Sequence, residues 1–480
     1  MQPASFFFYD LETSGINSRD ARIMQFAGVR TDLNLKPIGE PENILIKLTP
    51  DILPDPDAIL ITGITPQQTL ADGITEAEFL QHFAENIATP GTVFLGFNTV
   101  RFDDEFMRCL HYRNFYDAYE WQWQDGKSRW DILDVVRMVR ALRPEGIKWP
   151  FDVNGKPTNR LELLTGLNGL SHEHAHDALS DVYATIEVAR LIRNKQPKMF
   201  DYLFSMRDKR KVADLVDAEQ PFVYTSGQYS SEFEKTAVAV KLGDHPKKQG
   251  TALVFDLRND PLQYKDVTPE QLAEAWKWKK DSTEPRLPVK QLAYNKCPAV
   301  APLGVLDDAS RERLQIDLQT IQKNFNALRA MPGFADNVRK AADILDAGFQ
   351  TTLLADDRHV DSQLYDGFFG PQDKQSMRVV RAAQPAELGD LGLHFKDKRL
   401  EALLPLYKAR NHPKQLNDEE RQAWDEFCKK QLLGGGSKSR MGWFMGRLQD
   451  IANQGNLTGH QEYILEELKL YAESVMPEVD

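Results

Sequence analysis

Two acidic side chains close an apolar stretch near the start of the chain. Residues 6–12 read Phe-Phe-Phe-Tyr-Asp-Leu-Glu, and a turn signal at 13–15 follows, which predicts a buried strand. Side chains alternate faces along a strand, so Asp10 and Glu12 share one side of it. Burying two carboxylates is unfavourable unless a cation lies between them, and their oxygens suit Mg²⁺ or Mn²⁺. Taken alone, the pair also fits a solvated strand end.

A third acid stands where a helix should begin. An apolar strand predicted over 92–97 leads to Asn98, and Asp103 follows five residues later at the expected start of a helix. Acids in the first helical turn are favoured by the helix dipole, which accounts well for Asp104 and Glu105. Asp103 fits either that role or a third metal-binding carboxylate.

A fourth acid, Asp181, is expected in the second turn of a helix over 178–191, with His176 at or just before its start. Their spacing fits one helical face poorly, so we expect the preceding loop to position His176. Four carboxylates around two divalent ions can hydrolyse phosphodiesters, while a histidine accepts the proton of the attacking water. His172, His174 and His176 also raise the question of zinc, but no Cys or fourth ligand has suitable spacing.

Aromatic and basic residues follow the third acid. If this segment is helical, one face carries five aromatic side chains, namely Tyr112, Phe115, Tyr116, Tyr119 and Trp123. Such a stripe is typical of a protein core. Aromatic rings beside basic groups also hold unpaired bases, so the sequence leaves both interpretations open.

The elements that must position these residues fall into three regions. In the first, strands are expected over 23–31 and 44–48, a long loop over 51–66, and helices over 75–88, 130–142 and 160–167. The second region combines strands over 222–226, 236–242, 251–257 and 289–294 with helices over 269–280 and 310–331. The last region is helical, over 372–383, 397–410, 418–433, 441–453 and 460–475.

Length and composition set the general class. A chain of 480 residues exceeds what one core supports, so two or three domains are expected. No apolar run approaches the ~18 residues of a membrane span, and no secretory signal is recognisable. Three scattered cysteines fit free thiols in a reducing cytoplasm.

The distribution of charge matters more than its sum. The formal net charge is -12, but residues 1–190 hold 17 basic against 28 acidic residues, and the remainder is nearly balanced. Acid is therefore concentrated around the predicted metal site. Lysine alternates with aromatic residues at 276–280 and 290–296, and 244–248 adds a basic turn, so phosphate-binding grooves remain compatible with global acidity.

The ordered set Asp-x-Glu, Asn-x₃-Phe-Asp and His-x₄-Asp resembles the His-containing (DEDDh) branch of the DEDD exonuclease superfamily. Further motifs resemble bacterial exonuclease I, namely 60–66, 98–105, 112–117, 142–147, 176–178, 295–298 and 361–369. The resemblance spans nearly the whole chain and is weakest in 225–285 and past 430. Ser14 stands where the family pattern often has Phe.

The resemblance implies a fold and an activity. It implies an α/β ribonuclease-H-like exonuclease domain with a mixed sheet (1–195), a small β-rich SH3-like single-strand-binding domain with helical inserts (197–350) and an all-α C-terminal domain (354–480). Together these domains are expected to encircle single-stranded DNA. The implied enzyme digests that DNA processively from a free 3′ end to 5′-mononucleotides, in DNA repair and recombination.

The resemblance also implies roles for single residues. Two Mg²⁺ ions, which Mn²⁺ can replace, are expected on four acids: Asp10, Glu12, Asp103 and Asp181. His176 matches the general base, and Glu12 is expected to contact the substrate as well. Arg160 matches a contact to the phosphate nearest the cut. Other single-strand contacts are expected at Arg108, Tyr119, Trp123 and Arg137.

The expected partners are single-stranded DNA with a free 3′ end and the single-stranded-DNA-binding protein. The protein itself is expected to be a monomer in the cytoplasm that binds no membrane. Two other functions are compatible with parts of the sequence. A non-catalytic single-strand-binding module would not need the intact set of four acids and one histidine. An RNA-trimming DEDDh exonuclease would not need the two additional domains.

Overall fold

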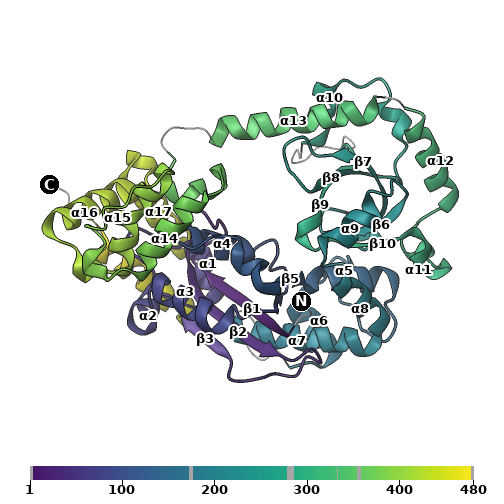
Figure 1. Cartoon of the computed structure of the whole chain (residues 1–480). Coiled ribbons are helices and arrows are strands. Elements are labelled where there is room, and N and C mark those ends of the chain that lie inside the picture. The colour runs from purple at the N-terminus through teal and green to yellow at the C-terminus, as the bar shows by residue number, and fades with distance from the viewer. Residues whose placement is uncertain (1–3, 172–176, 278–285, 332, 354–357, 477–480) are drawn as a thin grey trace.

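The computed structural model describes residues 4–171, 177–277, 286–331, 333–353 and 358–476. An α/β region lies at the centre, with a β-rich region on one side and a helical region on the other (Figure 1). One long helix, α13 (Phe334–Leu353), runs from the β-rich region toward the helical one (Figure 1). In the described residues, no helix is both long and apolar enough to cross a membrane.

The central region is built on a mixed sheet in the order β3-β2-β1-β4-β5. The strands are β1 (Ser5–Thr13), β2 (Ile23–Thr31), β3 (Glu42–Leu45), β4 (Thr92–Gly96) and β5 (Ser128–Asp131). β1 pairs antiparallel with β2 and parallel with β4. The central strand is covered on both faces, which explains its nearly continuous apolar sequence.

Helices cover the two faces of this sheet. Phe6 and Phe8 pack into a core shared with α5 (Ile132–Leu142) and α7 (Ala178–Lys195). Phe7 and Tyr9 pack on the other face, where further helices contribute core residues: α3 (Glu76–His82), the π turn Phe83–Ile87 and α4 (Asp103–Arg113). The first face is completed by α6 (Leu161–Asn168) and α8 (Pro197–Ser205).

The loop expected over 51–66 is wrong, because that segment contains a helix. Its α1 (Pro56–Thr62) is capped by Asp55, whose carboxylate accepts from Asp57 N at 3.0 Å, and α2 (Pro66–Asp72) follows behind a Thr65 capping box. Pro56 and Pro66 each occupy the first helical position. Proline is favoured there because its missing N–H has no intrahelical partner, so these loop signals in fact mark helix starts.

The prediction that 112–123 forms a helix with an aromatic stripe is also wrong. Helix α4 ends at Arg113, and Phe115 has a positive φ of 60°, which breaks the helix. Two 3₁₀ turns follow at Glu120–Gln122 and Gln124–Gly126. Tyr112 and Phe115 are buried against the helical region, whereas Trp123 is 61% exposed.

The β-rich region holds an antiparallel sheet in the order β10-β6-β7-β8-β9. Its strands are β6 (Phe222–Thr225), β7 (Thr236–Asp244), β8 (Thr251–Asp256), β9 (Val289–Ala293) and the unpredicted β10 (Ala299–Pro302). Its helices are α9 (Lys209–Val216), α10 (Pro269–Trp276), α11 (Asp308–Arg313) and α12 (Leu318–Arg329). The single helix expected over 310–331 is thus split, at Gln315 with its φ of 53°.

The five helices expected beyond residue 361 are confirmed to within two residues at each end. They are α14 (Pro371–Ala382), α15 (Lys398–Asn411), α16 (Asp418–Leu433), α17 (Arg440–Gln454) and α18 (Gly459–Ser474). Helices α17 and α18 pack on α1 through a shared core that includes Ile59 and Phe444. The helical region is therefore joined to the central region by an apolar interface.

A buried ionic cluster also joins these two regions. Asp361 accepts hydrogen bonds from Arg22 at 2.6 Å and from Arg410 at 3.0 Å, and Arg410 also pairs with Asp51 at 2.8 Å. All four side chains are at most 4% exposed. Burial alone would raise the pKa of Asp361, but the two arginines hold it far below its usual range. Removing one partner of such a cluster leaves an uncompensated buried charge.

We expect Asp361→Asn to lower the free energy of unfolding by about 3 kcal/mol, because two buried arginines lose a shared carboxylate. Chemical denaturation near neutral pH measures this loss. The folded-state pKa of Asp361 is lowered, so its stabilisation is present above the ordinary aspartate pKa of about 4 and is lost as pH falls below it. In the Asp361→Asn variant, the free energy of unfolding should therefore fall less between neutral pH and pH below about 4 than in the wild type.

Asp366→Asn is the matched control. Asp366 pairs with Arg358 at 2.7 Å, but its side chain is 38% exposed, so its loss should change the unfolding free energy by less than about 1 kcal/mol. Equal destabilisation by the two variants would contradict the importance of the buried cluster.

Candidate active site

Three carboxylates meet at one edge of the central sheet. Asp10 and Glu12 lie one pleat apart on β1, and Asp181 lies on α7; one oxygen of each is within 4.8 Å of the others. Asp181 is in the first turn of α7, which begins at the predicted residue, Ala178, and not in the second turn as the sequence suggested. Asp177 caps this helix by accepting from Ser180 N at 3.1 Å.

Asp103 is the buried first residue of α4, outside that tight cluster of three. The turn that leads to it is held by Asp131, whose two carboxylate oxygens accept from Asn98 N at 3.0 Å and Val100 N at 3.2 Å. Asn98 has a φ of 75°, a conformation that Asn adopts more readily than most residues. The positioning role of Asp131 has no sequence signal beyond a strand-end acid.

The electrostatics of the cluster call for a cation. Burial, followed by repulsion from Asp181, raises the pKa of Asp10. Burial and Asp10 likewise raise the pKa of Glu12 to about 9, and burial and Asp10 raise that of Asp103. A divalent ion among these oxygens would relieve the repulsion, and an all-carboxylate donor set suits hard cations. The acidic set therefore fits divalent metal binding.

A cavity of about 1660 Å³ is lined by basic and aromatic side chains. Its cationic members are Lys209, Arg210, Lys247, Lys248 and Lys277, and its rings are Tyr294, Tyr365 and Phe368. The sequence indicated the basic turn at 247–248 and parts of 276–280 and 290–296, but not the contribution of α9. These lining residues lie up to 159 positions apart in the sequence, from Lys209 to Phe368, so only the fold assembles them.

Comparison with known proteins decides the family. Family models match in chain order as Exonuclease over 7–189, Exonuclease I SH3-like domain over 207–342 and Exonuclease I C-terminal domain over 358–475. Exodeoxyribonuclease I of Escherichia coli is 42% identical over 429 residues, which cover 88% of this chain and 89% of that protein. The chain belongs to the exonuclease I family.

Solved structures of the exonuclease I family agree with this assignment. E. coli exonuclease I in complex with a dA16 oligonucleotide superposes with a TM-score of 0.91 and 38% identity, covering 98% of this chain and 100% of that one. An SSB/exonuclease I structure in complex with the inhibitor CFAM gives a TM-score of 0.89 and 38% identity, over 99% and 100%. The expected fold class, a ribonuclease-H-like exonuclease domain with SH3-like and helical C-terminal domains, is confirmed. The chain is therefore an exonuclease.

Two of the residues predicted to contact single-stranded DNA lie together, near the cavity. The guanidinium of Arg108 lies 5.8 Å from the ring centre of Tyr119, which in turn is 5.6 Å from the ring of Phe368. Arg108 is buried and donates to Glu105 at 2.6 Å and to Gln122 at 3.1 Å. Tyr119 is thus the more accessible of the two.

The remaining predicted residues are scattered. Arg137 pairs with Asp134 at 2.8 Å and lies against Gly227 of the SH3-like domain, where an added Cβ would come within 3.1 Å of its guanidinium. Arg160 is 67% exposed and pairs with Glu162 at 2.5 Å. His172, His174 and His176 lie outside the described residues, so the role of His176 stays a prediction.

Ser14, at the position where the family often has Phe, is buried. Its hydroxyl oxygen accepts from Arg22 N at 2.8 Å, and its own N–H donates to Arg22 O at 2.8 Å. This residue therefore fixes the turn after Glu12 instead of offering an aromatic surface.

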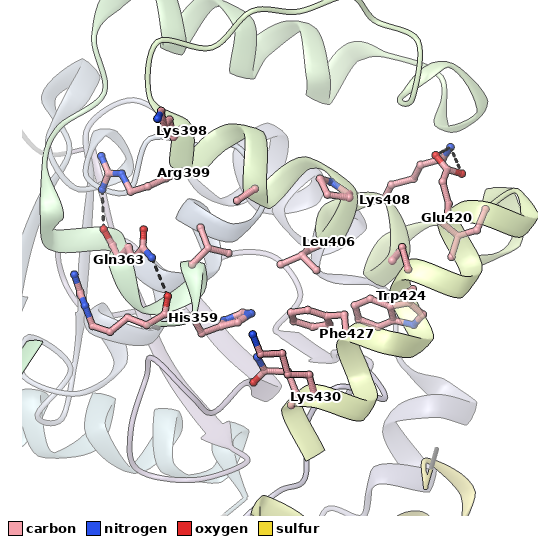
Figure 2. A pocket seen from close by; sticks show the side chains of 18 of the residues that line it. His359, Gln363, Lys398, Arg399, Leu406, Lys408, Glu420, Trp424, Phe427 and Lys430 are labelled. Carbon is pink, nitrogen blue, oxygen red and sulfur yellow. Dashed lines mark hydrogen bonds and ion pairs between the residues drawn. The ribbon is translucent and has the colours of Figure 1, made fainter. Parts of the chain in front are cut away.

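A separate cavity of about 800 Å³ lies within the C-terminal domain, against α15 and α16 (Figure 2). Its walls combine rings and cations, and Trp424 and Phe427 stack with ring centres 5.5 Å apart. None of the four acids predicted for catalysis, all of which the structure describes, lines it.

We expect Asp10→Asn to weaken Mn²⁺ binding about tenfold or more, because it removes one of the charged oxygen ligands that set affinity. Titration calorimetry with Mn²⁺ measures the affinity without any substrate. Glu40→Gln, an exposed acid in the loop between β2 and β3, should bind Mn²⁺ as the wild type does. Equal affinity in Asp10→Asn and wild type would refute the assignment of Asp10 to a metal site.

Proposed function

We propose that this chain is a 3′-to-5′ exodeoxyribonuclease that degrades single-stranded DNA processively to 5′-mononucleotides. The observation that carries the proposal is the convergence of the carboxylates of Asp10, Glu12 and Asp181. Burial and the charge of Asp10 raise the pKa of Asp103, the fourth acid. Binding of a dA16 oligonucleotide by a similar exonuclease I supports the choice of substrate.

Two Mg²⁺ ions, for which Mn²⁺ can substitute, are the proposed cofactors. The residues that would hold them are Asp10, Glu12, Asp103 and Asp181. Bound there, such ions would supply Lewis-acid chemistry that favours a hydroxide nucleophile and stabilises the negative charge of the leaving 3′ oxygen. His176, which precedes Asp177 in the sequence, would take the proton from the attacking water.

The single-stranded DNA is proposed to be held by contacts of basic side chains with its phosphates and by stacking of its bases on aromatic rings. The cavity offers five cationic side chains and three aromatic rings, a combination that binds single strands without reading their sequence. Tyr119 and Trp123 would add rings, and Arg108 and Arg137 positive charge. Arg160, which is exposed, is the proposed contact to the phosphate nearest the cut, and Glu12 would contact the terminal nucleotide.

Several expectations from the sequence remain part of this proposal. We keep the domain limits 1–195, 197–350 and 354–480, supported by the end of α7 at Lys195. The proposed protein partner is the single-stranded-DNA-binding protein, supported by the SSB/exonuclease I structure. A monomeric cytoplasmic enzyme of DNA repair and recombination completes the proposal.

Digestion of 3′- and 5′-labelled substrates tests the activity. Single-stranded DNA should lose its 3′ label at once and shorten stepwise from that end in Mg²⁺, while RNA of equal sequence and blunt duplex should persist. Faster digestion of RNA would favour an RNA-trimming exonuclease. Binding of DNA without any shortening would favour a binding module instead.

We expect His176→Ala to slow turnover by about 10²–10⁴, the usual loss when a general base is removed. Affinity for Mn²⁺ should stay near that of the wild type, because the histidine is not a proposed ligand. Single-turnover digestion and metal titration separate the two effects. Full rescue by excess Mg²⁺ would mean that His176 serves the metal.

Removing cavity lysines should weaken strand binding through lost phosphate contacts. For the double variant Lys247→Ala/Lys248→Ala, we expect the slope of log affinity against log salt to flatten by about 1.4, at about 0.7 per contact. Fluorescence anisotropy of a labelled oligonucleotide at several salt concentrations measures the slope. Lys323→Ala, an exposed lysine on α12 outside the cavity, is the control and should leave the slope unchanged.

A further inference from the structure

One carboxylate, that of Glu105, contacts all three domains. Glu105 lies in the first turn of α4, two residues after Asp103. One of its oxygens accepts from Arg108 of the exonuclease domain at 2.6 Å and lies 3.4 Å from Nζ of Lys296 in the SH3-like domain. Its other oxygen accepts from the hydroxyl of Tyr365 in the C-terminal domain. Three separate parts of the chain therefore meet on one side chain.

The neighbouring acid, Asp104, adds a second connection at the same turn of α4. Arg129 is hydrogen-bonded to Asp104 and also donates to the carbonyl oxygen of Asn295 at 2.7 Å. The other oxygen of Asp104 accepts from the hydroxyl of Tyr9 at 2.6 Å. The 295–297 turn of the SH3-like domain is thus anchored at two points on the helix end that carries Asp103.

The segments joined in this way also form walls of the basic and aromatic cavity that is proposed to hold the DNA. Asn295 and Tyr365 both line it, and so does Phe368, which is 85% exposed. Tyr365 is 47% exposed although its hydroxyl reaches Glu105. A strand in the cavity would therefore touch the same two segments that Glu105 holds together.

The contacts of Glu105 with Arg108, Lys296 and Tyr365 form a single junction. The Glu105 side chain is 24% exposed and that of Arg108 is 7% exposed, so salt screens this junction less than a surface ion pair.

We propose that Glu105 is a positioning residue that latches the SH3-like and C-terminal domains onto α4 and thereby sets how many nucleotides are removed in each binding event. The inference rests on the proposed function. Loss of the carboxylate would release Lys296 and Tyr365 together, while Asp10, Glu12 and Asp181 stand on other elements. Asp103 lies on the same turn of α4 but keeps its own carboxylate. The effect should therefore fall on retention of the strand more than on the cleavage step.

Glu105→Gln is the principal test, in digestion of long 5′-labelled single-stranded DNA challenged with excess unlabelled trap. We expect the number of nucleotides removed per binding event to fall about threefold to tenfold, as for the loss of a charged hydrogen bond. Removal of the first nucleotide from a preformed complex in a single turnover should stay within about twofold of the wild type, because the metal-binding acids are untouched.

Two further variants test the same proposal if Glu105→Gln folds poorly. Tyr365→Phe and Lys296→Met each remove one arm of the junction and should each shorten the digestion per event. Combined with Glu105→Gln, neither should add a further loss, because the contact is already gone. Full additivity in the combined variants would overturn the proposal.

Asp57→Asn is the matched control. Asp57 pairs with Arg447 through two bonds of 2.7 Å, between the exonuclease and C-terminal domains, and none of its atoms lines the cavity. Its product lengths should equal those of the wild type. Wild-type lengths in Glu105→Gln, or an equal loss in Asp57→Asn, would refute the latch. Failure of the wild type to shorten DNA from its 3′ end would instead refute the proposed function.

Discussion

Repulsion among carboxylates at one edge of the central sheet is the constraint on which the rest of the structure depends. Asp10 and Glu12 are fixed by the pleat of β1, and Asp181 by the first turn of α7. Burial first, and then repulsion between neighbouring carboxylates, raises the pKa values of Asp10 and Glu12. The fold thus holds these acids together although they repel each other. Such an arrangement persists only if the surrounding core is rigid, because each acid would otherwise turn toward water.

That rigidity comes from packing on both faces of the sheet. The aromatic residues before Asp10 alternate between two cores, one shared with α5 and α7 and the other with α3 and α4. A strand packed on both faces cannot slip by one residue without moving every side chain to the wrong core. The same apolar run that identifies the strand in the sequence therefore also fixes the direction in which Asp10 and Glu12 point.

The additional domains are tied to this scaffold by ionic contacts at different depths. The Arg22–Asp361–Arg410 cluster is fully buried and fastens the C-terminal domain where solvent cannot reach. The Glu105 junction is partly exposed and lies beside the cavity that Tyr365 helps to line. We therefore assign the first to permanent assembly and the second to function.

The sequence alone predicted the strands and helices with strong periodicity. It also singled out Asp10, Glu12 and Asp181, which the structure brings together, because acids near strand and helix ends follow local rules. It misread 51–66 and 112–123, where Pro56 marks a helix start and a positive φ at Phe115 ends a helix. Only the tertiary structure decided the cavity walls and the three-domain contact of Glu105. Local sequence encodes which residues form an element, whereas a contact such as that between Glu105 and Tyr365, 260 positions apart, depends on how the elements pack.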